Sequence, residues 1–384
     1  MKKLIALLLA AVMVLSLCAC GKTEAPAAAP EAPAAPAAPA APAAPAESSD
    51  AQAGEYPDFS GRSLLFGVWG GSFADAALKS YVDPFNKLTG ANVTIEEYGS
   101  DVTVKVVQQY EQGIEGYDVI SGCGVLDQMA VMADHGAIIE LDYSKLPNSK
   151  YVEACYEYCV GQYIISTIIA WNKDVYGDNP PDTIAKYYDT VNYPGNRADV
   201  NYSNTGGFEQ MALGLGWVDS LDQCYPLPED RCYAFYDEIG YKDSVVLWWD
   251  SNAQIRQALA DGEVDCGHFW GGAVIESIVS DGMTNIGMSN EYASLITDCM
   301  AICSTCKDPE LAYAFLNYCL SAEAQASWTN LKYYLPVNSE AIKYVNPEIA
   351  PYLELPETAF YCDVPYWQQT FEAHAARYME YISR

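Results

Sequence analysis

Aromatic side chains, rather than histidine, dominate the chemistry available to this chain of 384 residues. The sequence has 30 Tyr and 8 Trp but only 3 His, which does not favour a catalytic centre built on several histidines. Neither the nucleophile pattern G-x-S-x-G nor the metalloprotease pattern H-E-x-x-H occurs. The composition therefore favours recognition by aromatic surfaces over catalysis by a nucleophile and a base.

Two tryptophans, Trp69 and Trp270, each end a β-rich run and precede two glycines. Glycine pairs permit tight turns and close approach of a ligand to the backbone. A cation over a Trp or Tyr ring gains about 0.5–2 kcal/mol, and an alkyl ammonium removed from water also needs a carboxylate. The two segments are therefore candidates for an amine site, with packing between domains as the alternative role of each tryptophan.

The first residues predict a processing segment. Two lysines precede an apolar run over 4–17 that is too short to span a bilayer, as in a signal peptide. The run ends in Leu17–Gly21 (LCACG), which resembles the lipobox of bacterial lipoproteins. That resemblance implies cleavage after residues 1–19 and attachment of lipid to the thiol of Cys20.

Residues 20–55 are expected to form the lipidated cysteine and a tether. Segment 24–53 is almost entirely Ala, Pro, Ser and Glu, and its repeated Pro prevents a regular helix. No later apolar run approaches the length of a spanning helix. We therefore expect an extracytoplasmic domain, lipid-anchored to the outer face of the cell membrane.

The cysteines indicate thiols rather than a metal or redox centre. Of 13 Cys, Cys18 leaves with the leader and Cys20 is reserved for lipid, so an odd number remains and complete pairing within one chain is impossible. Cys303 and Cys306 have the spacing of a zinc or redox motif, but no second such motif and no nearby His completes a zinc site. We expect buried or free thiols, and neither a cofactor nor a metal.

The charge balance excludes some partners. With 51 Asp+Glu against 20 Lys+Arg, the formal net charge is -31, which argues against nucleic acid and against electrostatic attachment to anionic lipid. Charged residues make up only 18% and hydrophobic residues 51%, so most of the chain can bury a core. The acidity is compatible with a cationic cargo, but a solvated surface explains it more simply.

The globular part, about 56–384, is longer than an ordinary single domain and suggests two lobes. Alternation of strands and helices predicts a mostly parallel sheet with helices on both faces. Ligands of such sheets lie beyond the carboxyl ends of the strands, so loops Trp69–Ser72 and Ser121–Gly124 should face a common crevice. The expected strands are 63–69, 93–97, 117–121, 264–270 and 300–303. The expected helices are 73–88, 102–112, 125–135, 252–260, 273–280 and much of the chain from 309. Pro84 should bend the first of these helices, and Gly90 should end it.

Ordered landmarks across this region resemble a known family. Segments 68–93 (VWGGSFADAALKSYVDPFNKLTGANV), 257–272 (QALADGEVDCGHFWGG) and 307–325 (KDPELAYAFLNYCLSAEAQ) resemble the extracellular solute-binding proteins of ABC importers, closest to the spermidine/putrescine-binding group. The resemblance implies an α/β, two-lobed type 2 periplasmic-binding-protein fold, in which each lobe has a mostly parallel sheet flanked by helices and a hinge joins the lobes.

The resemblance also implies the division of the chain. Lobe one would hold 56–170 and 299–384, and lobe two 171–298. The chain would cross between them near Ala170–Asn172 and near Thr297–Asp298. Ligand would bind between the lobes and stabilise a closed form that docks on a permease.

The same resemblance implies roles for particular residues. Trp69 and Trp270 match cleft aromatics, and Asp298 matches the amine-binding carboxylate, with a surface or capping role as its alternative. Tyr334 matches an aromatic before a Pro-Asn loop, and Gln368 a polar cleft residue. The predicted ligand-binding residues are Trp69, Ser72, Cys123, Asn204, Glu209, Trp270, Asp298, Tyr334 and Gln368.

One departure from the family concerns lobe two. The acids that hold the second ammonium of a polyamine fall on Asn204 and Gly207, which puts a diamine in doubt. Glu209 could compensate, depending on whether its helix buries or exposes it. A monoamine or zwitterion needs fewer acids, and backbone amides at 205–207 could receive an anionic group. Cys123 replaces a hydroxyl and makes the site less hydrophilic.

We therefore expect a membrane-anchored substrate-binding protein of an ABC importer, with no enzymatic activity. Its partners would be a small amine or polyamine, a permease and, through the lipid, the membrane, with no nucleic acid, and the protein would be a monomer. Alternatives are an amino-acid-like zwitterion, thiamine, a phosphonate or ferric iron held by the pairs Tyr187-Tyr188 and Tyr333-Tyr334. An extracytoplasmic thiol or redox enzyme is the alternative from another class.

Overall fold

The computed structural model of the protein describes residues 56–384. The predicted leader, the lipidation of Cys20 and the tether lie outside the described residues. Within 56–384, none of the helices has the length and apolar character needed to cross a bilayer.

Ten strands of the described residues form one sheet, whose main path runs β2-β1-β3-β8-β4-β7-β5-β6, with β9 and β10 added at β4 and β8. The strands are β1 (Ser63–Trp69), β2 (Asn92–Tyr98), β3 (Val119–Gly124), β4 (Val160–Asn172), β5 (Arg197–Val200), β6 (Val245–Trp249), β7 (Cys266–Trp270), β8 (Ile286–Ile302), β9 (Leu335–Pro336) and β10 (Phe360–Tyr361).

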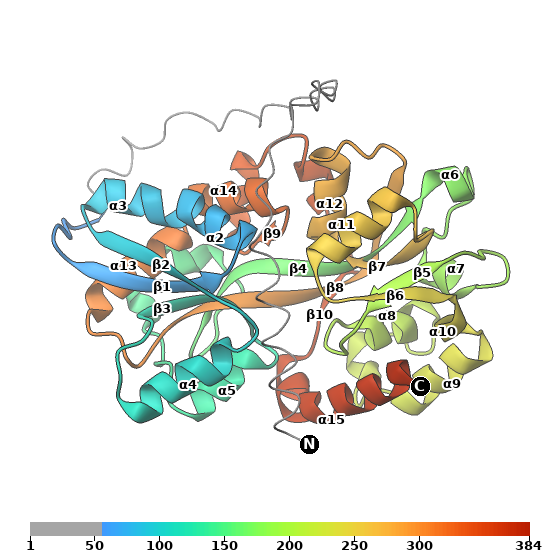
Figure 1. Ribbon diagram of the computed structural model, residues 1–384, viewed down its shortest axis with the longest axis horizontal. Coiled ribbons are helices and arrows are strands. Elements are labelled where there is room, and N and C mark those ends of the chain that lie inside the picture. Colours follow the sequence, from blue (N-terminus) through green and yellow to red (C-terminus); the bar gives the residue numbers. More distant parts are fainter. Residues whose placement is uncertain (1–55) are drawn as a thin grey trace, which may run out of the picture. The chain divides into compact units, whose positions relative to one another are not determined.

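Helices flank this sheet (Figure 1). The α-helices are α2 (Ser72–Ala77), α3 (Asp83–Thr89), α4 (Val102–Gln112), α5 (Gln128–Asp134), α6 (Lys173–Tyr176), α7 (Ile184–Tyr188), α8 (Gly207–Gly214), α9 (Glu229–Glu238), α10 (Tyr241–Ser244), α11 (Asn252–Asp261), α12 (Gly271–Val279), α13 (Pro309–Cys319), α14 (Ala322–Lys332) and α15 (Val364–Ser383). A π-helical turn spans Leu78–Val82, and 3-10 turns span Tyr143–Lys145, Pro147–Tyr151, Leu221–Cys224, Ser339–Tyr344 and Ala350–Leu353.

Two sets of parallel strands define two lobes. Lobe one is built on β1, which pairs in parallel with β2 and β3, and lobe two on β5, which pairs in parallel with β6 and β7. The long strands β4 and β8 pair antiparallel with each other and extend through both sets (Figure 1). The two-lobed α/β architecture predicted from the sequence is therefore confirmed.

The strand pairing shows where the chain changes lobes. Pairing of β3 with β8 ends at Gly124 opposite Asp298, and pairing of β7 with β4 begins at Trp270 opposite Thr167. The expected first crossing, Ala170–Asn172, lies farther along β4, where Ala170 and Trp171 already pair with β7 of lobe two. The buried strand continues through the crossing without a break, so the sequence offers no local signal for it.

The first predicted helix is interrupted, as its proline suggests. Helix α2 passes into the π-helical turn, and α3 begins at Asp83 with Pro84 in its first turn. The backbone stays helical through Val82 and Asp83, so Pro84, which has no N–H to donate, lies where the helix changes from π to α geometry. Gly90 ends α3 in the left-handed conformation, at φ 71°, as predicted.

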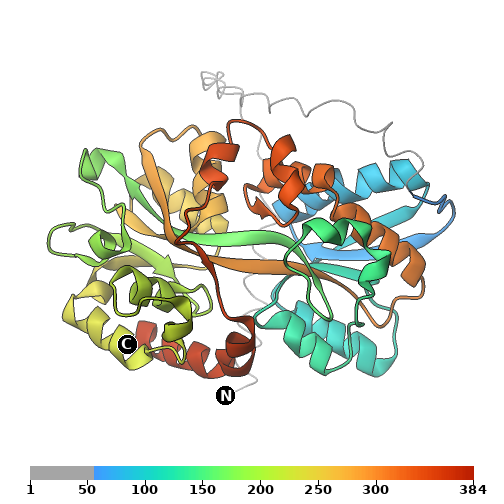
Figure 2. The same ribbon diagram turned by 180° about the vertical axis from the view of Figure 1, so that it is seen from behind.

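The last helix, α15, contacts lobe-two elements, although the predicted division places 299–384 in lobe one. Its Trp367 donates Nε1–H to Glu209 of α8 over 2.9 Å, and the Tyr378 hydroxyl donates to the Val200 carbonyl over 2.8 Å. Figure 2 shows the helix beside the lobe-two elements. The apolar pattern of 364–383 shows that one face is covered, but not which lobe covers it.

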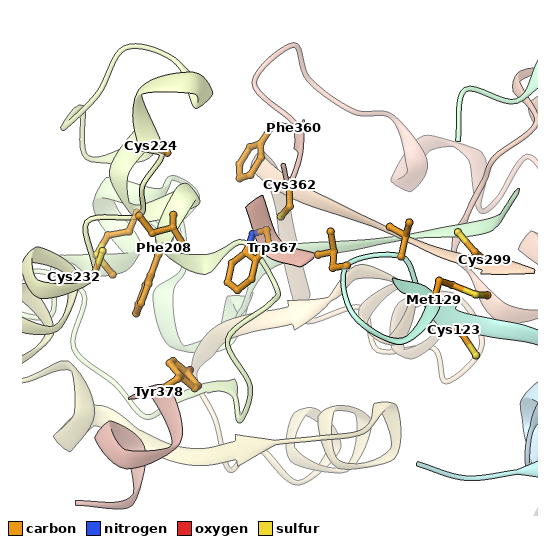
Figure 3. Packing of buried hydrophobic residues seen from close by; sticks show 14 of the residues in the cluster. Cys123, Met129, Phe208, Cys224, Cys232, Cys299, Phe360, Cys362, Trp367 and Tyr378 are labelled. Carbon is orange, nitrogen blue, oxygen red and sulfur yellow. The ribbon is translucent and has the colours of Figure 1, made fainter. Parts of the chain in front are cut away.

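The described cysteines are packing residues. All eleven in 56–384 are free, and all but Cys155 and Cys306 are buried. Figure 3 shows several of them among the aromatic and aliphatic side chains of the largest core cluster. Burial raises the pKa of the Cys303 thiol well above its ordinary value and that of Cys306 to about 12. A reactive thiolate is therefore disfavoured at the Cys303–Cys306 motif.

Candidate ligand-binding site

Asp298 lies at the edge of the lobe-one sheet, where β8 turns toward lobe two. It pairs with Gly124 of β3 on one side and with Tyr163 of β4 on the other. The Tyr163 hydroxyl donates a hydrogen bond of 2.7 Å to Asp298 Oδ2. The predicted carboxylate is therefore held by the sheet and by one hydroxyl.

A second carboxylate, Asp127, follows β3 directly and begins α5, where its Oδ1 accepts the Gln128 N–H over 2.6 Å. Burial raises the pKa of Asp127 to about 6 and, with the negative charge of Asp127 adding to it, that of Asp298 to about 7. Both side chains keep a partly accessible surface. Among the described residues, neither carboxyl forms an ion pair.

Trp69 lies against the loop that follows β3. Its indole N–H donates to the Gly122 carbonyl over 2.6 Å, and its ring meets Tyr98 edge-on with centroids 5.3 Å apart. Gly122 has φ 68°, and a Cβ atom there would lie 2.8 Å from Trp69 Cδ1. Only glycine therefore allows this close contact between the two loops without strain.

Lobe two contributes Trp270 and Tyr202. Their ring centroids are 6.0 Å apart, and Trp270 also meets Trp249 at 5.0 Å. Burial raises the pKa of the Tyr202 hydroxyl, and the nearby charges of Asp298 and Asp127 add to this effect. Tyr202 therefore adjoins both Asp298 and Asp127, and Trp270 packs behind it.

Tyr334, directly after α14, joins the lobes. It is fully buried, stacks on Tyr163 with centroids 5.1 Å apart, and accepts a hydrogen bond of 2.8 Å from Asn252 Nδ2 of lobe two. A Cβ atom on Gly272 would lie 2.8 Å from Tyr334 Cε1. Gly272, the second glycine after Trp270, is thus needed for interlobe packing.

Two more predicted residues lie at the contact between the lobes. Asn204 Nδ2 is 3.4 Å from Asp127 Oδ2, and Gln368 Nε2 donates to the Val125 carbonyl over 2.8 Å. Asn204 comes from lobe two and Gln368 from α15, which packs on lobe two, whereas Asp127 and Val125 belong to lobe one. These amides therefore bridge the interface beside the acids.

The structure does not bring Glu209 to this cluster. Its side chain is fully buried, and its Oε1 accepts hydrogen bonds from Trp367 Nε1 over 2.9 Å and from the Tyr225 hydroxyl over 3.0 Å. Helix α8 is buried along most of its first two turns, so its sequence pattern could not show which way Glu209 points. Glu209 does not replace the acids that are missing at Asn204 and Gly207.

Ser72 and Cys123 also have other surroundings than expected. Ser72 is exposed, and its Oγ accepts a hydrogen bond of 2.9 Å from Lys332 Nζ. Cys123 is fully buried with its sulfur 3.6 Å from the Tyr98 hydroxyl. Cys123 therefore lies beneath the site loops rather than on an accessible wall.

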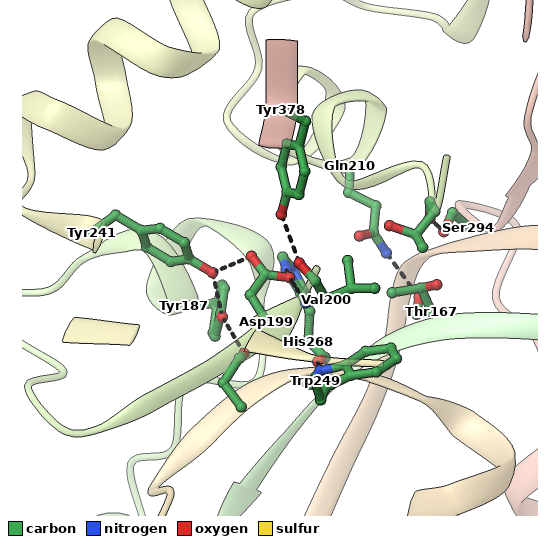
Figure 4. A network of polar contacts seen from close by, with 12 residues as sticks. Thr167, Tyr187, Asp199, Val200, Gln210, Tyr241, Trp249, His268, Ser294 and Tyr378 are labelled. Atoms are coloured by element: carbon green, nitrogen blue, oxygen red, sulfur yellow. Dashed lines mark hydrogen bonds and ion pairs between the residues drawn. The ribbon is translucent and has the colours of Figure 1, made fainter. Parts of the chain in front are cut away.

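A buried polar network, part of which Figure 4 shows, holds the lobe-two loop over 201–206. Tyr202 and Asn204 belong to this loop. The Ser294 hydroxyl donates to the Thr205 carbonyl, and Gln210 Nε2 donates to the Thr167 carbonyl over 2.8 Å. These contacts tie the loop and the start of α8 to the crossing strands. Their partners are distant in sequence, so no local motif predicts them.

The start of α8 is not suited to an anion. A cavity of about 10 Å³, enough for about one water molecule, lies there between Ser203, Thr205 and Gly207, and Asp199 also lines it. Asp199 Oδ2 accepts the Tyr241 hydroxyl over 2.7 Å (Figure 4). An anion at these amides would face this buried carboxyl group, which opposes the expected anionic subsite.

The two tyrosine pairs that were alternatives for binding iron do not lie together at the site around Asp298. Tyr187 and Tyr188 lie in the lobe-two core around Tyr241 and His268, far along the chain from Tyr334. Within 56–384 no group of three or more His, Cys, Asp or Glu side chains is arranged to hold a metal ion.

Sequence reasoning missed Asp127, Tyr163 and Tyr202. An aspartate before an apolar helical stretch, as at Asp127, is a recognisable N-cap signal. Tyr202 lies in the segment where the family places its acids, but only the acids were sought there. Tyr163 lies inside a buried strand and has no signal of its own.

The arrangement of two lobes around acids and aromatic rings is that of a two-lobed solute-binding protein, and comparisons with known proteins agree. Residues 80–357 match the model of the family described as bacterial extracellular solute-binding protein. The spermidine/putrescine-binding periplasmic protein 1 of Haemophilus influenzae is 25% identical over 279 residues, which cover 70% of this chain and 74% of the relative. A γ-aminobutyric acid (GABA)-binding protein of Pseudomonas aeruginosa is 24% identical, over 53% of this chain and 57% of that protein's length.

Solved structures extend the comparison. A GABA receptor superposes with a TM-score of 0.75 at 27% identity, covering 84% of this chain and 98% of the receptor. The binding protein MotA of A. tumefaciens B6, in complex with glucopine, gives a TM-score of 0.69 at 27% identity, with 83% and 99% covered. The chain therefore belongs to the bacterial extracellular solute-binding protein family.

Membership of this family defines the general function of the protein. The protein is a substrate-binding protein of an ABC transporter, which binds a small molecule and delivers it to a permease, and it is not an enzyme. The family also implies an extracytoplasmic location.

Proposed function

We propose that the protein captures a small protonated amine, of the putrescine or spermidine type, between its two lobes. The observation that carries the proposal is Asp298: a half-buried carboxyl group, hydrogen-bonded by Tyr163 and without a cationic partner among the described residues. A carboxylate withdrawn from water is costly unless a cation or several donors compensate it. A protonated amine supplies both.

The surroundings of Asp298 support the same ligand class. Asp127 adds a second negative group, and Trp69, Tyr202 and Trp270 offer faces for methylenes or for the charge itself. The partial match to a spermidine/putrescine-binding protein is consistent with this chemistry.

A zwitterion such as GABA is the second candidate, and Lys332 is the observation that favours it. Its side chain is buried, its Nζ lies 4.3 Å from the Phe73 ring centroid and bonds to Ser72, and it forms no ion pair within the described part of the chain. A carboxylate of the ligand could pair with it. The GABA-binding relatives are consistent with this alternative.

In the proposed cycle the amine stabilises the closed arrangement of the lobes, which then docks on the permease. The protein would act as a monomer, held at the outer face of the membrane by lipid on Cys20. Replacing Cys20 with Ala should release the protein into the medium, as measured by fractionation. An unchanged membrane fraction would refute the anchor without affecting the binding site.

A thermal-shift panel tests the cargo. Putrescine, spermidine, GABA and other amino acids, thiamine, a phosphonate and ferric iron are compared on the full chain. A ligand at about 100 times its dissociation constant stabilises the folded state by about 2.7 kcal/mol. A shift with an amine supports the proposal, whereas a shift only with a phosphonate or iron overturns it.

A further inference from the structure

Asp127 connects three parts of the molecule. Its Oδ1 caps α5 through the Gln128 N–H, and its Oδ2 lies 3.4 Å from Asn204 Nδ2 of lobe two. Its backbone follows the loop that Trp69 contacts through Gly122. It is therefore a lobe-one acid that lies at the surface where lobe two approaches.

Gly124 shows how close Asp127 and Asp298 are. A Cβ atom on Gly124 would lie 2.6 Å from Asp127 Oδ1 and 3.9 Å from Asp298 Oδ1, so these two oxygens are at most 6.5 Å apart, the sum of both distances. An ammonium that donates to two carboxylates over about 2.8 Å each needs oxygens no more than about 5.6 Å apart, which this upper limit allows. Because Gly124 has no side chain, no Cβ atom separates these two oxygens.

The surroundings of the two acids would stabilise a bound cation. Both are largely surrounded by protein, and no Lys or Arg of the described residues forms an ion pair with either. Their other neighbours include the hydroxyls of Tyr163 and Tyr202 and the amide of Asn204. Two carboxyl groups this close repel each other when both are ionised, and a cation between them removes that cost.

We propose that Asp127 is a second ligand-binding carboxylate that grips, together with Asp298, one ammonium group carrying several N–H donors, and that links its capture to lobe two through Asn204. This inference rests on the proposed function and specifies its ligand class. Primary ammonium groups fit the pair, whereas quaternary ammonium groups lack N–H donors and do not.

The test compares ligand pairs and variants of the full chain by calorimetric titration. The probes are putrescine and GABA, each beside its fully N-methylated analogue. In the unchanged protein the primary amine should bind at least about tenfold more tightly than its quaternary analogue. Asp127→Asn keeps a good cap residue for α5 but removes the charge, and should weaken amine binding about tenfold or more.

Asp363→Asn is the matched control, because Asp363 is also an N-cap aspartate, with its Oδ1 accepting the Tyr366 N–H over 2.7 Å, and is exposed. It should bind as the unchanged protein does. Gly124→Ala is a second variant that retains both charges and fills the space between them, and it should also weaken amine binding. It serves in place of Asp127→Asn if that variant does not fold.

The outcomes separate the two proposals. If neither amine binds the unchanged protein, the proposed function fails. If an amine binds and Asp298→Asn abolishes it, but Asp127→Asn or Gly124→Ala binds it as before, the function stands and the role of Asp127 is overturned. Equal affinity for a primary amine and its quaternary analogue also overturns it.

Discussion

The Tyr334 ring packs directly over Gly272, so closely that a Cβ atom at that glycine would lie 2.8 Å from Tyr334 Cε1. Tyr334 belongs to the segment after α14 and Gly272 to the first turn of α12 in lobe two. The contact joins the lobes next to Trp270, so a side chain at position 272 would push apart two elements that hold the site.

Gly272→Ala should therefore destabilise the protein, although alanine suits a helix better than glycine. Overpacking of this kind costs about 1–3 kcal/mol, measured as the free energy of unfolding in denaturant. Gly207→Ala is the control, because it also lies in the first turn of a helix but has no atom within 4 Å of its added Cβ. Equal stabilities of the two variants would contradict the packing argument.

Asp298→Asn should abolish the stabilisation of the protein by an amine, because the neutral amide cannot compensate an ammonium. The apo variant should remain folded, since Tyr163 can still donate to the amide oxygen. Thermal shift with and without putrescine measures the first expectation, and circular dichroism the second. An amine response like that of the unchanged protein would remove Asp298 from the site.

The pH dependence of the apo protein should follow from the same two acids. Burial raises the pKa of Asp298 to about 7 and of Asp127 to about 6, above their ordinary value of 3.8. The folded state therefore binds more protons than the unfolded state between about pH 4 and 7, and these groups lower the stability as pH rises through that window. The unfolding free energy of Asp298→Asn should consequently increase relative to that of the unchanged protein as pH rises through this window.

Amine affinity should change in the opposite direction. The ammonium needs ionised carboxylates, so protonation of Asp298 and Asp127 competes with it, and affinity should fall as pH drops from about 7 to 5. Titration of putrescine across that range measures this, together with proton release in buffers of different ionisation enthalpy. An affinity independent of pH would show that neither carboxyl group takes up a proton in the unliganded site.

The sequence predicts the framework of this site better than its electrostatics. Trp69 and Trp270 are recognisable because each ends a strand before two glycines, and the parallel β-α pattern shows that such ends meet. Tyr163 is hidden, since a strand buried on both faces has no alternation that marks one residue as special. The orientation of Glu209 is hidden for a similar reason, because α8 is buried on most sides. The partner of Asp127 lies in another lobe, at Asn204, and only the fold brings the two together.

Lys332 distinguishes the two candidate cargoes. Burial lowers the pKa of its ammonium group, while the charge of Glu276 raises it in part, and Ser72 is its hydrogen-bond acceptor.

Lys332→Met preserves most of the buried volume but removes the charge. If the cargo is a diamine, this variant should retain its affinity or bind slightly more tightly, because a repelling cation is gone. If the cargo is a zwitterion whose carboxylate pairs with Lys332, GABA binding should weaken about tenfold or more while binding of a monoamine of similar length stays unchanged. Parallel titrations of putrescine, GABA and butylamine on the variant decide between them, and a GABA affinity unaffected by the substitution would exclude Lys332 as the partner of the carboxylate.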